Sequence, residues 1–200
     1  MIEKIAIIIL AAGTSSRFGS PKQLLTYNGN TLLRHAVDAA LGTGCQSVSV
    51  ILGANIEVLR GELKDKPVII VENSGWEEGM ASSIRCGLEN IKNSILNPDS
   101  VIFMVCDQPH VSSSLLVSLI EKKQETGMPI VASSYEGKSG TPALFHRTIF
   151  PLLMELVGDK GARKIIADNP EKVALVSFPG GIIDIDTVSD YELLKKENDN

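Results

Sequence analysis

The sequence lacks several features that mark large classes of proteins. It has no basic excess, because 19 lysines and arginines are outnumbered by 24 aspartates and glutamates, for a net charge of −5. That balance disfavours a nucleic-acid-binding protein, which usually presents a basic face. It leaves a nucleotide site open, since a few local cations and a metal ion can outweigh the overall sign.

Cysteine and histidine patterns typical of metal sites are also missing. Cys45, Cys86 and Cys106 form no CxxC pair, and the histidines show no ligand spacing, so a structural zinc site and a disulfide framework are disfavoured. A cytoplasmic protein is expected from this cysteine usage. The apolar run at residues 5–12 is too short for a membrane span and lacks a signal-peptide layout, so no membrane partner is expected.

Repeats, low-complexity tracts and linkers are absent from the 200 residues, and one domain covering residues 1–200 is expected. Short β-branched runs alternate with segments of helical spacing. The runs are KIAIIILAA, SVSVILG, PVIIVE, SVIFMVCD, PIVASSY and VALVSF, each as long as a strand buried on both faces. This alternation predicts a three-layer α/β fold with a mostly parallel, Rossmann-like sheet.

Residues 133–145 break the alternation. The segment SSYEGKSGTPALF has two strand-like ends around Gly137 and Gly140, and Pro142 is not expected in the middle of a sheet. We expect a hairpin, or a small β-excursion, over the carboxyl edge of the strands. Ligands of such folds bind at that edge, so this segment could line a substrate site.

The connection after the first strand, residues 11–22, reads AAGTSSRFGSPK. It matches neither the Walker A spacing nor the GxGxxG spacing, which disfavours a P-loop kinase and a dinucleotide fold. It still offers what a polyphosphate needs, because small residues let backbone amides approach, Arg17 supplies a planar fork and Lys22 a mobile charge. The alternative is a solvated loop.

Asp107 ends the run SVIFMVCD, at the carboxyl end of a predicted parallel strand. A carboxylate there faces the ligand edge and could hold Mg²⁺, a hard cation that favours carboxylate and phosphate oxygens. The alternative for a strand-end aspartate is a helix cap or a turn.

The stretch LAAGTSSRFGSPKQLL resembles the signature LAAGxSxRxGxPKxLL of nucleotidyltransferases with the MobA-like fold. Within that group the chain is most similar to molybdenum cofactor cytidylyltransferases and their relatives in purine catabolism. The resemblance implies the nucleotide-diphospho-sugar transferase type of sheet. It also implies that Arg17, Lys22 and Asp107 are catalytic, with both cations on the phosphates of a bound nucleotide.

Four more segments resemble family motifs in the same order. GMASSI resembles a segment near the nucleotide base, SGTPALF and GDKGAR resemble segments on the acceptor side, and DIDTVSDY resembles DIDTPEDL. The last implies Asp186 as a metal ligand together with Asp107, although Val188 and Ser189 depart from the pattern. Capping of the final helix is the alternative for Asp186.

The resemblance implies a nucleotide-binding site and an acceptor-binding site. The nucleotide-binding residues are Leu10, Ala11, Ala12, Gly13, Arg17, Lys22, Gly79, Ser82, Ser83 and Asp107. The acceptor-binding residues are Gly140, Pro142, Gly158, Asp159, Gly161 and Arg163. The alternatives are a capped helix beside Trp76, a plain turn at residues 158–161 and a surface role for Arg163.

Together these resemblances imply a Mg²⁺-dependent enzyme that transfers CMP from CTP to molybdopterin-bound molybdenum cofactor and releases pyrophosphate. LAAG rather than LAGG is the family feature that favours CTP over GTP. A molybdoenzyme or its maturation chaperone is the implied protein partner. The alternatives are GTP as donor, a sugar or polyol phosphate as acceptor, and a non-catalytic carrier of the molybdenum cofactor.

Overall fold

A seven-stranded sheet forms the centre of the computed structural model, which describes residues 3–15, 18–92 and 94–198. The strand order is β5-β4-β1-β6-β8-β7-β9, and β8 runs against all the others, so the sheet is mostly parallel as predicted. The strands are β1 (Ile5–Leu10), β4 (Ser47–Leu52), β5 (Ile69–Glu72), β6 (Ser100–Val105), β7 (Ile130–Tyr135), β8 (Lys138–His146) and β9 (Val173–Ser177). A separate two-stranded sheet pairs β2 (Thr26–Tyr27) with β3 (Asn30–Thr31).

Helices lie between and after the strands, as the predicted alternation implies. They are α1 (Leu32–Leu41), α2 (Ile56–Glu62), α3 (Met80–Lys92), α4 (Ser113–Thr126), α5 (Phe150–Met154), α6 (Ala162–Asp168) and α7 (Val188–Asn198). Short 3₁₀ turns lie at Lys22–Leu24, Trp76–Glu78, Arg147–Ile149, Pro170–Lys172 and Pro179–Ile182. The side chains of Thr31 and Ser112 cap α1 and α4, because each accepts a hydrogen bond from a backbone amide of the first turn.

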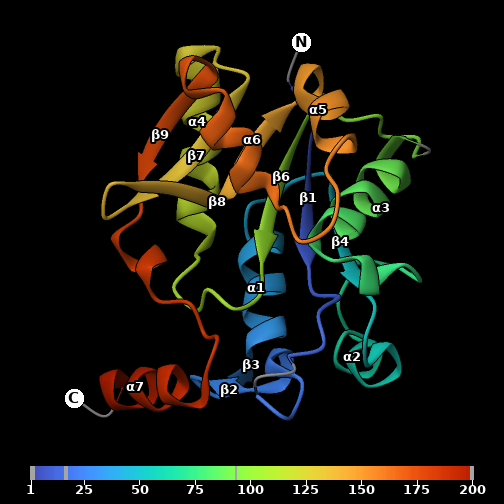
Figure 1. Cartoon of the computed structure of the whole chain (residues 1–200), viewed down its shortest axis with the longest axis vertical. Coiled ribbons are helices and arrows are strands. Elements are labelled where there is room, and N and C mark those ends of the chain that lie inside the picture. The colour runs from blue at the N-terminus through green and yellow to red at the C-terminus, as the bar shows by residue number, and fades with distance from the viewer. Residues whose placement is uncertain (1–2, 16–17, 93, 199–200) are drawn as a thin grey trace.

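Side chains of β1 alternate between two buried layers. Ile5, Ile7 and Ile9 pack in a core with α1, α2 and α4, whereas Ala6 and Ile8 pack in a second core with α3, α5 and α6. All six residues of β1 are buried, as a strand covered by helices on both faces requires. The predicted three-layer arrangement is therefore present (Figure 1).

The predicted hairpin at residues 133–145 is formed by β7 and β8, but β8 lies inside the main sheet between β6 and β7. The expectation that Pro142 avoids a central strand was wrong. The register of the β7–β8 pair shifts between Ala132 and Ser133, and Pro142 lies opposite this irregularity. Proline is tolerated there because its missing N–H is not needed for pairing with β7. The hydroxyl of Ser133 donates to the carbonyl of Pro142 over 2.7 Å.

The carboxyl ends of β1 and β6 point toward the end of the molecule where β2, β3 and α7 lie (Figure 1). A small apolar cluster holds α7 there, with Leu32, Ile185, Tyr191 and Leu194 buried together. The Tyr191 hydroxyl also donates to the carbonyl of Thr26 over 2.7 Å. Helix α7 and its preceding segment are thus fixed beside the carboxyl edge of the sheet. Among the described helices, none has the length and apolar character needed to cross a bilayer.

The packing of α3 on β1 makes a stability prediction. A Cβ atom on Gly87 would lie 2.9 Å from Ile8 Cγ2, inside the second core. We expect Gly87→Ala to lower the free energy of unfolding by about 1 kcal/mol, because overpacking of about 1–3 kcal/mol exceeds the helix-propensity gain of about 1 kcal/mol. Gly61→Ala in α2 meets nothing within 4 Å and should stabilise the protein instead. Urea unfolding of both variants checks this, and equal stabilisation of the two would contradict it.

Candidate active site

Three cavities lie along the carboxyl edge of the sheet, and the first two share lining residues. The lysine cavity, about 250 Å³, is lined by Leu10, Ala11, Gly13, Thr14, Ser15, Phe18, Lys22, Gln23, Met80, Val105, Cys106, Asp107 and Asp186. The tryptophan cavity, about 590 Å³, is lined by Leu10, Ala12, Gly13, Thr14, Trp76, Glu77, Gly79, Met80, Ser83 and Asp159. The arginine cavity, about 170 Å³, is lined by Tyr135, Glu136, Lys138, Arg163, Gly181, Ile182 and Asp184.

The first loop is held by a buried glutamine. Gln23 is 2% exposed, and its amide nitrogen donates to the carbonyls of Ala11 and Gly13 over 3.1 and 2.9 Å. The Ser15 hydroxyl donates to the Gln23 carbonyl oxygen and accepts from the Lys22 amide, at 3.2 and 3.0 Å. These bonds fix the loop around the lysine cavity and set the starting direction of the Lys22 side chain.

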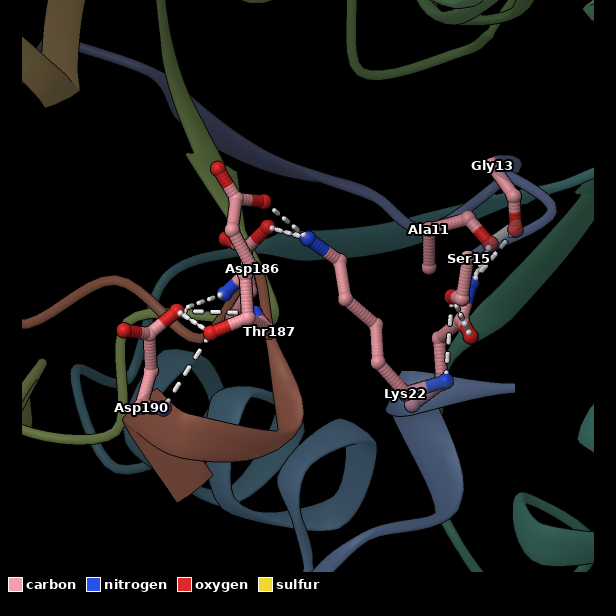
Figure 2. A network of polar contacts seen from close by, with 9 residues as sticks. Ala11, Gly13, Ser15, Lys22, Asp186, Thr187 and Asp190 are labelled. Carbon is pink, nitrogen blue, oxygen red and sulfur yellow. Dashed lines mark hydrogen bonds and ion pairs between the residues drawn. The ribbon is translucent and has the colours of Figure 1, made fainter. Parts of the chain in front are cut away.

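The Lys22 ammonium lies between two carboxylates from distant parts of the chain. Its Nζ is 2.5 Å from Oδ2 of Asp107 and 3.1 Å from Oδ1 of Asp186. Figure 2 shows the Lys22 side chain reaching from the first loop to Asp186. The side chains of Lys22 and Asp107 are only 19% and 15% exposed, so this contact is shielded from solvent more than an ordinary surface ion pair.

A third carboxylate completes the group. One oxygen from each of Asp107, Asp184 and Asp186 lies within 4.8 Å of the other two. The Oδ1 atom of Asp107 is buried and accepts no hydrogen bond from the residues that the structure describes. Converging carboxylates, one of which also has a buried oxygen without a hydrogen-bond partner, are the donor set that Mg²⁺ or Mn²⁺ prefers. The residues therefore fit a divalent metal.

The segment that carries Asp184 and Asp186 is fixed at both ends. The amide of Ile185, which is fully buried, donates to the carbonyl of Asp107 over 3.0 Å. On its other side, Oδ2 of Asp190 accepts from the amides of Asp186 and Thr187, at 3.1 and 2.7 Å, and from the Thr187 hydroxyl at 2.8 Å (Figure 2). Bonds to the Thr187 side chain and backbone lower the pKa of Asp190.

Crowded charges shift the neighbouring pKa values. Burial opposes the charge of Lys22, yet the carboxylates of Asp107 and Asp186 raise its pKa well above the ordinary lysine value. Burial and the charges of Asp107 and Asp186 raise the pKa of Asp184 to about 7. Burial, with a smaller contribution from Asp107, also raises the pKa of Cys106 to about 12, so this thiol stays protonated. A neutral Asp184 is thus accessible in the metal-free protein near pH 7.

The start of α3 borders the tryptophan cavity, where it meets the turn at residues 158–161. The amide of Ala81 donates to the carbonyl of Gly158 over 3.0 Å. The hydroxyls of Ser82 and Ser83 both accept from the buried Asn73 amide, and Ser82 also donates to the Gly79 carbonyl. These internal bonds take up much of the donor capacity at the helix start, so a ligand role for Ser82 and Ser83 stays a prediction.

The structure brings most predicted site residues together. Leu10, Ala11, Ala12, Gly13, Lys22, Gly79, Ser83, Asp107 and Asp186 line the lysine or tryptophan cavity. The predicted acceptor residues separate, since Asp159 lines the tryptophan cavity and Arg163 the arginine cavity. Gly140 lies against the Tyr135 ring, and its bare Cα leaves room for that hydroxyl. Ser82, Pro142, Gly158 and Gly161 line none of the three cavities, and Arg17 lies outside the described residues.

Two residues of the site, Asp184 and Gln23, were not among those predicted. Asp184 and Asp186 alternate with the buried Ile185, and this two-residue period, which places both carboxylates on one side, was the available signal. Gln23 is a lone polar residue among the leucines of PKQLL, and its burial depends on loop carbonyls that only the folded chain supplies.

The chain is similar to known proteins over most of its length. A family model described as the MobA-like NTP transferase domain matches residues 7–173. Nicotine blue oxidoreductase of Paenarthrobacter nicotinovorans is 32% identical, covering 94% of this chain and 95% of that protein. Purine catabolism protein PucB of Bacillus subtilis is 25% identical, with the same coverage of 94% and 95%. A probable molybdenum cofactor guanylyltransferase of Bacillus mycoides is 30% identical, covering 77% of this chain and 76% of that protein.

Solved structures agree with the fold. The crystal structure of Rv0371c from Mycobacterium tuberculosis has a TM-score of 0.83 at 30% identity, covering 98% of this chain and all of that one. A structure of Rv0371C in complex with manganese has a TM-score of 0.80 at 27% identity, covering 96% of this chain and 98% of that one. Both matches therefore cover nearly the whole chain.

Asp190 accepts a hydrogen bond from the backbone amide of Asp186 and so orients a proposed metal ligand. We expect Asp190→Ala to weaken Mn²⁺ binding about tenfold, because residues that orient metal ligands are typically worth that much. Ser112→Ala removes a comparable helix cap from α4 and should leave Mn²⁺ affinity unchanged. Electron paramagnetic resonance of free Mn²⁺ measures both. Equal affinities in the two variants would show that Asp190 only caps its helix.

The raised pKa of Asp184 makes a prediction about stability. Its folded-state pKa of about 7 exceeds the value of about 3.9 expected in the unfolded chain, so its contribution to stability falls as pH rises from 4 to 7. We expect metal-free Asp184→Asn to be more stable than the wild type at pH 8, with the difference disappearing at about pH 4. Urea unfolding across this range checks it, and parallel pH profiles would contradict it.

Proposed function

The chain belongs to the MobA-like NTP transferase family, and from this premise we propose that it transfers a nucleotidyl group from a nucleoside triphosphate to a phosphate-bearing acceptor. The more specific proposal is CTP as donor and molybdopterin-bound molybdenum cofactor as acceptor, with the product passing to a molybdoenzyme or its maturation chaperone. The observation that carries the proposal is the Lys22 ammonium, held against Asp107 and Asp186 beside the first loop.

Transfer requires an oxygen of the acceptor phosphate to attack the α-phosphorus of the nucleotide. The bond from the α-phosphorus to the bridging oxygen breaks, and pyrophosphate leaves with the electron pair. Lys22 reaches the lysine cavity from a fixed loop, so its ammonium can turn from Asp107 to phosphate oxygens and stabilise the charge that they gain. Buried Cys106 and Leu10 limit water in this cavity, which strengthens that interaction.

Asp107, Asp184 and Asp186 would hold the divalent metal that the family context suggests. A metal ion held there would supply positive charge that offsets the negative charge developing on the phosphate oxygens during in-line displacement. The manganese complex of Rv0371C, which is 27% identical, supports a divalent metal in this chain as well.

The acceptor is assigned to the arginine cavity. Lys138 and Arg163 line it, and neither side chain makes a hydrogen bond or ion pair with other described residues. Asp184 belongs both to this cavity and to the acidic group, so an acceptor phosphate bound here would lie next to the reaction centre. No general base is needed, since a phosphate monoester is already ionised near neutral pH.

Pyrophosphate release tests the proposal. Purified protein with Mg²⁺ and molybdenum cofactor is offered CTP, GTP, UTP and ATP separately. Release with CTP alone is the expected result. Release with another nucleotide would keep nucleotidyl transfer and reject the cytidylyl assignment. Nucleotide binding without release from any of them would favour a cofactor carrier.

Two substitutions test the roles of the central residues. Lys22→Ala should slow pyrophosphate release at least tenfold, which corresponds to about 1.4 kcal/mol of barrier height. Asp107→Ala should abolish release while leaving the circular dichroism spectrum unchanged. Lys64→Ala removes an exposed charge outside the three cavities and serves as the control. Unchanged turnover in Lys22→Ala would show that the first loop only connects β1 to the rest of the fold and does not bind the phosphates.

A redox reaction is the second candidate, because nicotine blue oxidoreductase is 32% identical over 94% of this chain. The first loop lacks the GxGxxG spacing of dinucleotide folds, which disfavours it. Oxidation of NADH or NADPH in the presence of nicotine blue, followed at 340 nm, tests this candidate. Oxidation of NADH or NADPH in this assay, together with no pyrophosphate release from any of the four nucleotides, would replace the transferase proposal.

A further inference from the structure

We propose that Asp159 reads the base of the bound nucleotide and restricts the donor to nucleotides whose base carries an exocyclic amine, as CTP does and UTP does not. This inference rests on the proposed function and specifies its substrate class. The resemblance had placed Asp159 on the acceptor side, whereas in the structure its side chain lines the tryptophan cavity.

The tryptophan cavity is the place for the nucleoside. It shares Leu10, Gly13, Thr14 and Met80 with the lysine cavity, so a nucleotide with its phosphates at Lys22 can extend directly into it. Its volume of about 590 Å³ is more than twice the 250 Å³ of the lysine cavity. The arginine cavity is smaller, at about 170 Å³, and its cations suit a phosphate better than a base.

The walls of this cavity match the two surfaces of a nucleobase. Leu10, Met80 and the half-buried ring of Trp76 offer apolar contact for a planar face. Gly53 lies behind the tryptophan, and a Cβ there would come within 2.5 Å of Trp76 Cβ, so the position of the ring depends on that glycine. The polar edge of a base would then face Glu77 and Asp159.

The carboxylate of Asp159 lies close to the start of α3. Its Oδ1 lies against the bare Cα of Gly79, where an added Cβ would come within 2.5 Å. The turn that carries it is tied to α3 by the bond from the Ala81 amide to the Gly158 carbonyl, 3.0 Å long. Gly79 has a φ of +109°, which only glycine adopts readily, so this close approach is built into the backbone.

Asp159 is also available to a ligand. It makes no hydrogen bond or ion pair with the other described residues, and the same holds for Glu77. Glu78 differs, because both its oxygens pair with Arg85 at 2.7 and 2.6 Å. The cavity therefore presents carboxylates whose lone pairs have no internal partner.

An ionised carboxylate can only accept hydrogen bonds. The amine at position 4 of cytosine donates, whereas the oxo group at position 4 of uracil accepts and would face the carboxylate with like partial charge. Asp159 is exposed in the ligand-free protein, so a bound base would displace water from its carboxylate. A base without a donor would leave that carboxylate unpaired and would bind more weakly. CTP and UTP thus form a matched pair that differs at the atom that Asp159 is proposed to contact.

Isothermal titration of the whole protein with CTP, UTP, GTP and ATP, in the presence of Mn²⁺ and without acceptor, tests the proposal. The wild type should bind CTP at least tenfold more tightly than UTP. Asp159→Asn has nearly the same shape but can donate through its amide, so the CTP-to-UTP preference should fall about tenfold or reverse. Glu155→Gln removes one exposed charge four residues away and outside the three cavities, and should keep the preference.

The outcomes separate this inference from the proposed function. Equal binding of CTP and UTP by the wild type, or an unchanged preference in Asp159→Asn, would overturn the role of Asp159 while leaving nucleotidyl transfer in place. Binding of none of the four nucleotides would overturn the proposed function and this inference together. The circular dichroism spectrum of Asp159→Asn should match that of the wild type, which shows that the variant is folded.

Discussion

The arrangement of the site depends on the ion pair between Lys22 and Asp107. Without a cation, three carboxylates converging within 4.8 Å would repel one another, and the lysine ammonium contacts two of them. A lysine on a flexible stem can move from carboxylate to phosphate when a metal and a nucleotide arrive. The ion pair therefore stabilises the ligand-free site and leaves its charges available for the proposed reaction.

The scaffold brings these groups together from three separate parts of the chain. The first loop follows β1, Asp107 follows β6, and Asp184 and Asp186 precede α7. Adjacent parallel strands place the first two side by side, while the bond from the Ile185 amide to the Asp107 carbonyl holds the last pair in place. Buried Gln23 fixes the loop on one side and Asp190 the acidic segment on the other, so polar bonds position the groups that the sheet brings near.

The sequence was sufficient to predict the layers, the strand segments and most of the residues that line the lysine cavity of the candidate site. Isoleucine runs and caps such as Thr31 are local signals, and the motif around Lys22 carries its chemistry in a short stretch. Features set by tertiary contacts were missed. Pro142 lies in a central strand because the β7–β8 register shifts beside it, and Asp159 meets Gly79 only when two distant loops fold together.

The most direct test of the account is a crystal structure of the protein with Mn²⁺ and a non-hydrolysable CTP analogue. The account predicts an anomalous manganese peak among Asp107, Asp184 and Asp186, with Lys22 Nζ moved from Asp107 to a phosphate oxygen and the base in the tryptophan cavity. A manganese peak elsewhere, or Lys22 still paired with Asp107 beside a bound nucleotide, would contradict it.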